Sequence, residues 1–585
     1  MLSYWQAIGD DPVPMLNNRG TVVSLDTETT GLEFYDDVLG MSLAWRDTNG
    51  KMQSVYLTAP TGQMSLVTAY KPLPVFDIRE LITELCLRHK LVFHNEVFDR
   101  RMMHRIDMVH PDPVFPTDDT MHLAGLLEWQ KDRHLVDLHR KYVGGRDEAW
   151  EEMKGKRKRL SEVPLEQVAQ YGRGDAVKTL EVEEVLLPRV RDHATYRSDR
   201  EYAALVMRMM RNGLRLNFEW CQRKKREFTD RMVGLNDILA GEGLRYPASN
   251  QDVAYFLFKH LGIDQGYASS VTKTKNAHFP YGIPSVDQDT IEAVADLHPT
   301  ANLIKEWRQL AGAISEYLDG YREHACIDGK VHALLDPFGT VSSRMAASHP
   351  NVMAIPMEDR GAAFGGLTGM FVSEFVGQKL WACDMSQAEV RLAAVYAQET
   401  PLLEALSRED DPYIAMAMRV WGDPAKRNSA KRATLASIYE VGADKFSKTH
   451  HVPIEDAVQI LADFRRFYPR IKLASSMAIN RATRLRYVEG YTGRRRWLGP
   501  DEQEHKAFNQ IIQMGIADIM KTAMLATCQI APLKLQIHDS LVFSLPTAKV
   551  KQANMKKDIQ AALAESVPHR FSSKVPFPSK FKEWQ

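Results

Sequence analysis

The stretch L-K-L-Q-I-H-D-S-L-V-F-S at residues 533–544 predicts two strands joined by a tight turn. Apolar side chains alternate with polar ones on either side of His538 and Asp539, as they do along half-buried strands. The turn therefore holds a carboxylate at the tip of a rigid hairpin. Most His-Asp pairs of this kind are ordinary polar turns, so this one becomes informative only beside a second carboxylate on a matching strand.

The composition is typical of a soluble globular protein with several domains. The chain has 585 residues, 44% hydrophobic and 26% charged, and that length predicts about two to four domains. The 75 Lys and Arg residues balance the 75 Asp and Glu residues, so net charge alone does not indicate a polyanion partner. The five cysteines lack metal-type or disulfide-type spacing, which indicates a reducing compartment and predicts a cytoplasmic location. We expect no membrane association, because no signal-peptide pattern and no sufficiently long apolar run is present.

A second predicted strand also ends in a carboxylate. Residues 380–383 form a short apolar run that ends at Asp384, and a helical pattern follows it. An Asp at the end of a strand is most often a helix cap or a turn residue. Beside Asp539 it would instead complete the carboxylate pair that a two-metal phosphoryl-transfer site needs.

Residues 427–439, between these strands in the sequence, carry a stripe of side chains at helical spacing. On a helix, residues four apart share one slowly drifting face. One interpretation is an amphipathic helix with two surface cations. The other is a nucleotide platform, on which the cations bind phosphates and the apolar and aromatic residues contact base and sugar. The stripe consists of Arg427, Lys431, Leu435 and Tyr439.

The first of three further carboxylate motifs follows an apolar strand at residues 21–25. Asp26 and Glu28 point to one face, because side chains alternate along a strand. Neighbouring carboxylates repel and are tolerated best with a cation between them, and oxygen-only ligands suit Mg²⁺ or Mn²⁺. A D-x-E pair on its own is as often ordinary surface.

The other two motifs each belong to a predicted helix. H-N-E-V-F-D at residues 94–99 follows a short apolar strand and places Asp99 in a helix. Y-G-R-G-D at residues 171–175 precedes a helical pattern, and if the helix includes Tyr171, then Tyr171 and Asp175 share a face. Each motif alone favours a structural interpretation.

Taken in order, the three motifs resemble those of the 3′–5′ proofreading exonucleases of the DEDD superfamily. The resemblance implies two metal ions, one to activate a water and one to stabilise the leaving 3′ oxygen, with Tyr171 orienting the water. It implies a ribonuclease H-like domain, a mixed sheet flanked by helices, over residues 1–190. Because few residues precede Asp26, we expect no separate 5′-nuclease domain in this chain. The implied metal ligands are Asp26, Glu28, Asp99 and Asp175.

The remaining motifs resemble the core motifs of the family A DNA polymerases, the bacterial DNA polymerase I and phage replicative group. With the exonuclease motifs, this resemblance covers nearly the whole chain. The motifs are D-M-S-Q-A-E-V-R at 384–391, R-x-x-x-K-x-x-x-L-x-x-I-Y at 427–439, Q-I-H-D-S-L-V-F at 536–543, T-V-S-S-R at 340–344, T-G-R-R-R at 492–496 and N-Q-I-I-Q-M-G at 509–515.

The polymerase resemblance implies a right-hand α+β domain at residues 191–585. Its thumb would span about 200–330, its palm about 331–395 and 490–585, and its fingers about 396–489.

The same resemblance implies roles for individual residues. Asp384 and Asp539 would hold two Mg²⁺ ions, with Mn²⁺ as a substitute, and Glu389 would be a steric gate against a 2′ hydroxyl. The incoming nucleotide would meet the stripe of residues 427–439. Contacts with the primer end or the minor groove are implied for Arg344, Asn509, Gln513 and His538.

Four positions depart from the family pattern. Leu435 stands where Phe or Tyr is usual, and Ser540 replaces the Glu that usually follows the catalytic Asp. His505 and Met353 replace a usual Arg and Gln. These departures put sugar discrimination and minor-groove checking in question, and they leave two firm polymerase carboxylates.

We therefore expect a monomeric, replicative DNA polymerase with proofreading that acts on primer–template DNA and dNTPs. The compact chain favours a phage enzyme in the bacterial cytoplasm, with helicase, primase or single-strand-binding proteins as candidate partners. One alternative is a single-subunit RNA polymerase, against which S-Q-x-E at residues 386–389 and the exonuclease motifs argue. The other is a catalytically silent DNA-binding scaffold, against which the carboxylates of both sites argue.

Overall fold

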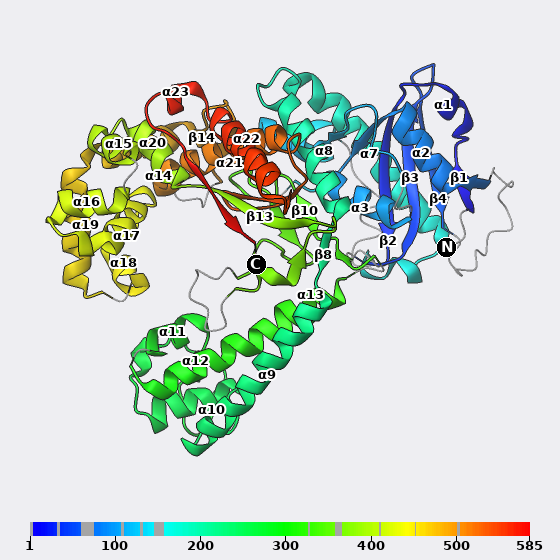
Figure 1. Ribbon diagram of the computed structural model, residues 1–585. Helices are drawn as coiled ribbons and strands as arrows, with labels where there is room; N and C mark the ends of the chain where they lie inside the picture. Colours follow the sequence, from blue (N-terminus) through cyan, green and yellow to red (C-terminus); the bar gives the residue numbers. More distant parts are fainter. Residues whose placement is uncertain are drawn as a thin grey trace.

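The computed structural model describes residues 4–31, 36–59, 75–106, 110–128, 133–144, 157–295, 297–325, 328–356, 366–408, 411–450, 452–499 and 504–584. Figure 1 shows an amino-terminal sheet with its helices beside a central body built on a second sheet. A helical arm projects from that body, and a further group of helices lies on the side away from the amino-terminal sheet. No helix in the described ranges is long and apolar enough to cross a bilayer.

The amino-terminal sheet is mixed, in the order β5-β1-β4-β3-β2-β6-β7. β2, β6 and β7 are parallel neighbours, and the other neighbours are antiparallel. β3 is buried along both faces except at Arg46, which explains its near-continuous apolar sequence. The expected mixed sheet flanked by helices is confirmed. The strands are β1 Tyr4–Gly9, β2 Val22–Thr29, β3 Val38–Arg46, β4 Met52–Thr58, β5 Val75–Asp77, β6 Lys90–Phe93 and β7 Asp118–Asp119; the helices are α1 Val13–Asn17, α2 Ile78–Arg88, α3 Glu96–Ile106, α4 Thr120–Leu127, α5 Leu135–Tyr142, η1 Arg157–Glu162 and α7 Leu165–Val190.

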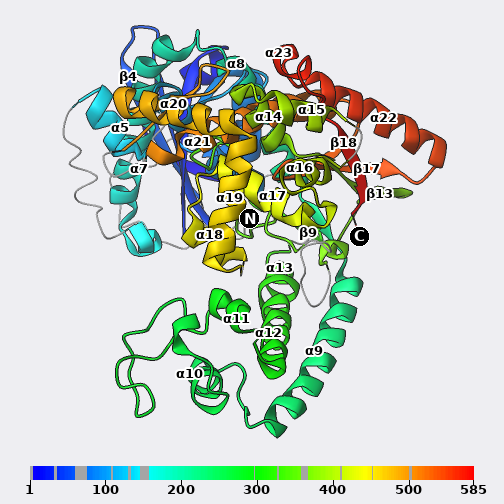
Figure 2. The ribbon, with the colours of Figure 1, turned by 90° about the vertical axis from the view of Figure 1, so that its left-hand side faces the viewer.

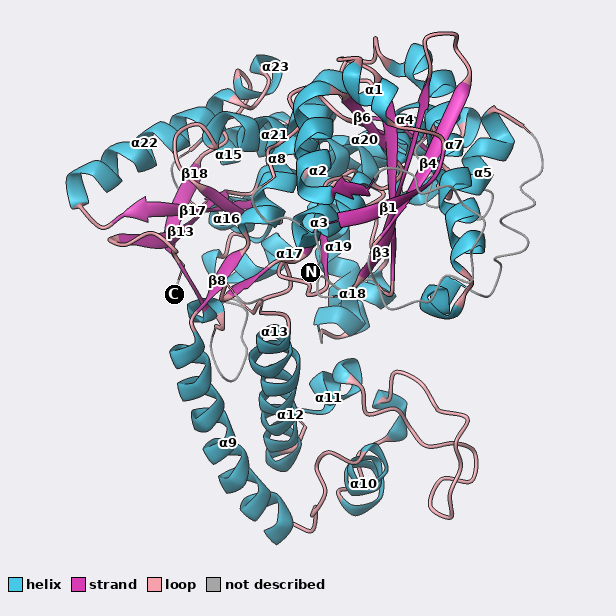
Figure 3. Cartoon of the chain, turned by 90° about the vertical axis from the view of Figure 1, so that its right-hand side faces the viewer, coloured by secondary structure: helices cyan, strands magenta, loops and turns pink. Residues whose placement is uncertain are grey.

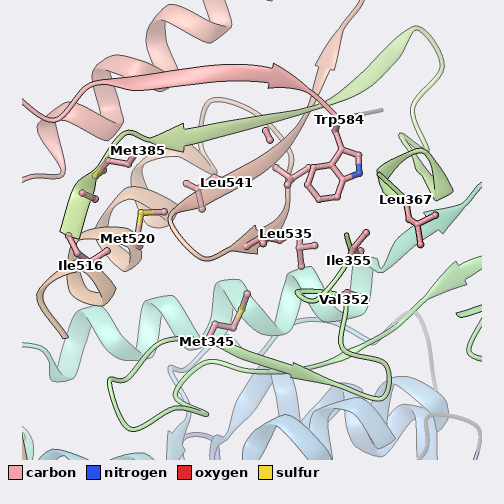
Figure 4. Packing of buried hydrophobic residues seen from close by; sticks show 14 of the residues in the cluster. Met345, Val352, Ile355, Leu367, Met385, Ile516, Met520, Leu535, Leu541 and Trp584 are labelled. Atoms are coloured by element: carbon pink, nitrogen blue, oxygen red, sulfur yellow. The ribbon is translucent and has the colours of Figure 1, made fainter. Parts of the chain in front are cut away.

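The central body contains an antiparallel sheet in the order β16-β17-β13-β18. Its hairpin has β16 at Leu533–Ile537 and β17 at Ser540–Pro546, so the predicted strand-turn-strand is confirmed. β13 spans Gln378–Met385 and β18 spans Ser579–Glu583. Figure 4 shows Leu535 and Leu541 of the hairpin in one apolar cluster with Ile516 and Met520 of α21, which spans Ala507–Thr527.

The prediction of a half-buried strand is wrong for β16, because all five of its residues are buried. Lys534 and Gln536, expected on the solvent side, are each 5% exposed. Lys534 forms an ion pair with Glu374, and its Nζ lies 5.0 Å from the centre of the Phe375 ring. Gln536 donates to the carbonyl of His538 at 3.0 Å. The segment around residue 374 covers this face, and contacts so distant in sequence leave no local pattern.

Helix α8, Tyr196–Asn212, lies between the two sheets and packs against α3 on one side and α21 and β16 on the other (Figure 3). The arm begins after α8 (Figure 2). At the base of the arm, β8, which precedes it, pairs with β9, which follows it, and β12 pairs with the other edge of β8. The expected thumb boundary near residue 200 therefore falls inside a helix of the central body. The strands are β8 Leu214–Leu216, β9 Lys330–Val331 and β12 Phe371–Val372, and the arm contains α9 Phe218–Gly241, α10 Asn250–Tyr255, η2 Phe256–His260, η3 Gln265–Tyr267, α11 Gln288–Ala295, α12 Pro299–Gly312, η4 Ala313–Asp319 and α13 Gly320–Glu323.

The remaining helices follow β13, pass through α15–α19, the group on the side away from the amino-terminal sheet (Figure 1), and return to α21. The two ends of α14 have residues in the left-handed region, Gln387 at φ 55° and Gln398 at φ 51°. The predicted helix at residues 427–439 is confirmed as α17. These elements are α14 Ala388–Ala397, α15 Thr400–Ser407, α16 Pro412–Trp421, η7 Pro424–Lys426, α17 Arg427–Ile438, α18 Ala443–His450, α19 Ile454–Phe467, α20 Pro469–Leu485, β14 Tyr487–Glu489, β15 Arg495–Trp497 and η8 Glu504–Lys506; β10 Leu334–Asp336, β11 Ala346–Ser348, η6 Thr368–Met370, α22 Lys549–Glu565 and α23 His569–Ser572 complete the body.

Candidate active sites

The hairpin tip brings two carboxylates together in the central sheet. β13 runs antiparallel to β17, with Asp384 opposite Ser540. The amide of Met385 donates to the carbonyl of Asp539 at 3.1 Å. His538 has φ 53°, a left-handed conformation that a two-residue turn requires. The pairing register therefore puts Asp384 and Asp539 on adjacent strand ends.

Asp539 is crowded by other acids. Burial, together with the charges of Glu389 and Asp384, raises the pKa of Asp539 to about 6, against the opposing charge of Arg344. The Asp539 side chain nevertheless keeps 21% of its surface exposed. Three acids around one accessible position are a donor set that a hard divalent cation would stabilise.

Glu389 is held from two sides. Nη2 of Arg344 lies 2.8 Å from Glu389 Oε1 and 3.5 Å from Asp539 Oδ1. The phenol of Tyr439 donates to Glu389 Oε2, and burial, followed by the charge of Glu389, raises the pKa of Tyr439. These contacts join three chain segments at one carboxylate, beside the Asp384 and Asp539 pair.

The stripe on α17 has one cation engaged and one exposed. Nε of Arg427 lies 2.7 Å from Asp411 Oδ2, at the amino-terminal cap of α16. Lys431 is exposed, and both Leu435 and Tyr439 are half-buried against the core. A phosphate that reached Arg427 would compete with Asp411.

The expected DNA contacts lie around the same cluster. Asn509 and Gln513 are one turn apart on α21, both half-buried, and Gln513 hydrogen bonds Tyr439. His538 is exposed at the hairpin tip.

The four departures occupy different surroundings. Ser540 is 9% exposed and lies opposite Asp384 on the neighbouring strand, so a family-type Glu there would add a fourth acid to Asp384, Glu389 and Asp539. Leu435 and Met353 are half-buried against the core, whereas His505 is exposed.

The amino-terminal sheet holds a second carboxylate cluster. Ligand oxygens of Asp26, Glu28 and Asp175 all lie within 4.8 Å of one another. β2 supplies the first two on one face, and α7 supplies Asp175 together with the buried Tyr171. A Cβ on Gly172 would lie 2.5 Å from Ser42 Oγ and 3.3 Å from Glu28 Oε1, so glycine is what lets α7 approach the sheet. This oxygen-only set fits Mg²⁺ or Mn²⁺.

Asp99 stands apart from those three. Its Oδ1 accepts from the amide and the hydroxyl of Thr27 at 2.8 and 2.7 Å. Burial raises the pKa of Asp99 well above its usual range, although the hydrogen bonds from Thr27 oppose that rise. Because Thr27 lies between Asp26 and Glu28 in the chain, Asp99 is tied to the cluster through the strand that carries it.

Several neighbours of this cluster were missed by the sequence analysis. Lys178 Nζ lies 2.6 Å from Asp175 Oδ1, and its position three residues later on the helix was a usable signal. Asp119 accepts from the amides of Asn95 and Glu96 at 3.2 and 2.8 Å, which fixes the start of α3. That contact spans two distant segments and leaves no local signal.

Two family models match the chain. The model described as DNA polymerase family A matches residues 219–582, and the model described as 3′–5′ exonuclease matches residues 13–191. The first covers the arm and most of the central body, and the second covers the amino-terminal sheet apart from β1.

Curated relatives named DNA polymerase I match over most of this chain. Those of Treponema pallidum and Synechocystis are 26% and 24% identical over 86% and 93% of this chain, and 52% and 58% of their own lengths. The thermostable DNA polymerase I of Thermus aquaticus is 26% identical over 76% of this chain and 53% of its own. The chain thus spans about half the length of these relatives.

A solved structure has the same fold. It is titled the POL domain of Pol1 from M. smegmatis in complex with DNA primer-template and dNTP. The TM-score is 0.74 at 18% identity, over 98% of this chain and 97% of that one.

Proposed function

The chain belongs to DNA polymerase family A, with a 3′–5′ exonuclease domain ahead of its polymerase domain, and on that premise we propose that it copies DNA and proofreads the copy. It would extend a primer with dNTPs along a template at the Asp384 and Asp539 site and remove mispaired 3′ ends at the Asp26 site. The observation that carries the proposal is the presence of two separate carboxylate clusters, one in each domain. The neighbour's title names primer-template DNA and dNTP as that protein's ligands, which supports the same ligand classes here.

In the polymerase site, we assign Asp384 and Asp539 to hold two Mg²⁺ ions, with Mn²⁺ as a substitute. Bound ions supply a lowered pKa for the attacking hydroxyl and neutralise charge on the triphosphate. Lys431, and Arg427 once released from Asp411, would bind the triphosphate.

Other side chains would shape the nucleotide and DNA contacts. Glu389, held by Arg344 and Tyr439, would occupy the space of a 2′ hydroxyl, and Leu435 and Tyr439 would contact the nascent base pair. Arg344, Asn509, Gln513 and His538 would contact the primer end.

In the exonuclease site, Asp26, Glu28 and Asp175 would hold the metal, with Asp99 as the fourth ligand. Tyr171 would orient the attacking water. Asp99 shares its Oδ1 with Thr27, so its second oxygen is the one that we assign to the metal. A mismatched end costs least to unpair, so fraying itself selects the substrate of this site.

The cellular setting rests on the sequence alone. A monomer that replicates phage DNA in the bacterial cytoplasm, with helicase, primase or single-strand-binding partners, stays a prediction.

A primer-extension assay with and without dNTPs tests the proposal. The wild-type chain should extend a primed template with dNTPs and shorten the primer without them. Asp26→Ala should abolish shortening and spare extension, and Asp384→Asn should do the reverse. Equal loss of both activities in both variants would contradict the two-site model, efficient extension with rNTPs would favour the RNA polymerase alternative, and a wild-type chain with neither activity would favour the silent scaffold.

A further inference from the structure

Four charged side chains are buried together behind the polymerase site. Arg494 Nη2 lies 2.8 Å from Asp199 and 3.1 Å from Asp518. Lys521 Nζ lies 3.5 Å from Asp518 and 3.6 Å from Asp199. All four residues are at most 6% exposed, and their formal charges cancel, which is how charge is tolerated in a protein interior.

The ammonium of Lys521 also contacts the turn that precedes Arg344. Nζ donates to Ser343 Oγ at 2.5 Å, and the ring centroid of Phe338 lies 4.8 Å from the same nitrogen. Burial lowers the pKa of Lys521, the positive Arg494 lowers it further, and Asp199 and Asp518 oppose both. The ammonium is thus anchored by two acids and has a proton left for the Ser343 hydroxyl.

Ser343 needs such a partner because its backbone is strained. It has φ 62°, a left-handed conformation that side chains other than glycine rarely adopt and that persists only where the surroundings enforce it. Thr340 closes the turn: its carbonyl accepts from the Ser343 amide, and its hydroxyl accepts from the Arg344 amide, each at 2.9 Å. The next side chain, Arg344, reaches Glu389 and Asp539.

We propose that Lys521 is a positioning residue of the polymerase site, which holds Ser343 in the left-handed turn and thereby directs Arg344 onto Glu389 and Asp539. The inference rests on the proposed polymerase function. Arg344 supports the carboxylate assigned as the sugar gate, so loss of the Lys521 contact should slow dNTP addition and also weaken discrimination against rNTPs. A residue that merely stabilises the fold would not change that ratio.

Single-nucleotide extension by the full chain, measured with dNTP and rNTP, tests the inference. Ser343→Ala removes the acceptor and keeps all four charges, and Lys521→Met removes the donor. Each should lower kcat/KM for dNTP by roughly tenfold, the size expected for one hydrogen bond to a charged group, and should raise the rNTP share. In an Arg344→Ala background neither change should slow extension further, because both act through Arg344.

The controls separate this effect from damage to the fold. Thr522→Ala alters the residue next to Lys521, whose hydroxyl donates to the backbone carbonyl of Asp518 at 3.0 Å, and should keep the wild-type sugar ratio because the four charges and the Ser343 turn are unchanged. Exonuclease activity on single-stranded DNA should survive in Ser343→Ala. Multiplicative losses in the double variants, or an unchanged sugar ratio in Ser343→Ala, would overturn the inference while the polymerase function stands. A wild-type chain that extends no primer would overturn both.

Discussion

At the scale of single residues, the polymerase site depends on how one carboxylate is held. Glu389 is 17% exposed in its side chain and is contacted by Arg344 on one oxygen and by Tyr439 on the other. Two contacts from different segments leave the carboxylate little freedom to rotate away from a 2′ hydroxyl. Sugar discrimination should therefore depend on the partners of Glu389 as well as on Glu389 itself.

Glu389→Ala should raise the ratio of rNTP to dNTP incorporation, since it removes the group that would clash with the 2′ hydroxyl. We expect a rise of roughly tenfold or more, the range in which small changes of pocket shape alter specificity. Tyr439→Phe removes one of the two contacts and should give a smaller rise. The measurement is kcat/KM with each nucleotide on one primed template; equal ratios in all three proteins would remove Glu389 from the gate.

Residues in spaced motifs could be predicted from the sequence, but their distant partners could not. Asp26, Glu28 and Asp175 stand in short motifs on a strand and a helix, and the structure brings them together. Arg494 lies in a quoted motif, yet its partner Asp199 is 295 positions away. Periodicity relates only neighbours within one element, so the buried charges that support the site become evident only in the three-dimensional structure.

At the scale of elements, the exonuclease cluster depends on how closely α7 packs on the sheet. Gly172 lies over Ser42 and Glu28, where a Cβ would come within 2.5 Å of Ser42 Oγ. The same helix carries Tyr171 and Asp175. The sequence predicted the helix and its shared face, but the close approach depends on β3, which is far away in the chain.

Gly172→Ala should push α7 away from the sheet and lower exonuclease activity while sparing primer extension. The loss should be roughly tenfold or more, since displacing a catalytic group by about 1 Å can cost about 10²-fold. Gly174→Ala is the matched control, because a Cβ there meets nothing within 4 Å and alanine favours a helix. The measurement is the nuclease rate of each variant on single-stranded DNA. If the Gly172→Ala and Gly174→Ala variants have equal nuclease rates, close packing of α7 does not position Asp175.

At the scale of the whole molecule, the two domains meet at a buried group of histidines beside α8. Arg101, on α3, donates to the carbonyls of His332 and His349 at 3.2 and 3.3 Å, which docks the amino-terminal domain on the central body. The ring centroid of His104 lies 5.4 Å from that of His332 and 6.4 Å from that of His110. This interface therefore places the buried His104 imidazole beside two other buried imidazoles.

Acid should weaken the molecule through His104. Burial, together with the nearby charges of His332, His110 and Arg211, lowers the pKa of His104 from 6.5 to about 3, against the opposing charge of Asp328. Between pH 6.5 and 3 the unfolded chain binds a proton at His104 that the folded chain does not bind. The free energy of unfolding therefore has its full His104 contribution above about pH 6.5 and falls as pH decreases toward 3.

Thermal unfolding at about pH 7.5, 6 and 5 should therefore show a Tm that falls with acid in the wild type. The Tm of the His104→Phe variant should fall less steeply with acid. The His505→Gln variant, changed at an exposed site, should keep the wild-type dependence of Tm on pH. Parallel slopes for wild type and His104→Phe would mean that the acid sensitivity arises elsewhere.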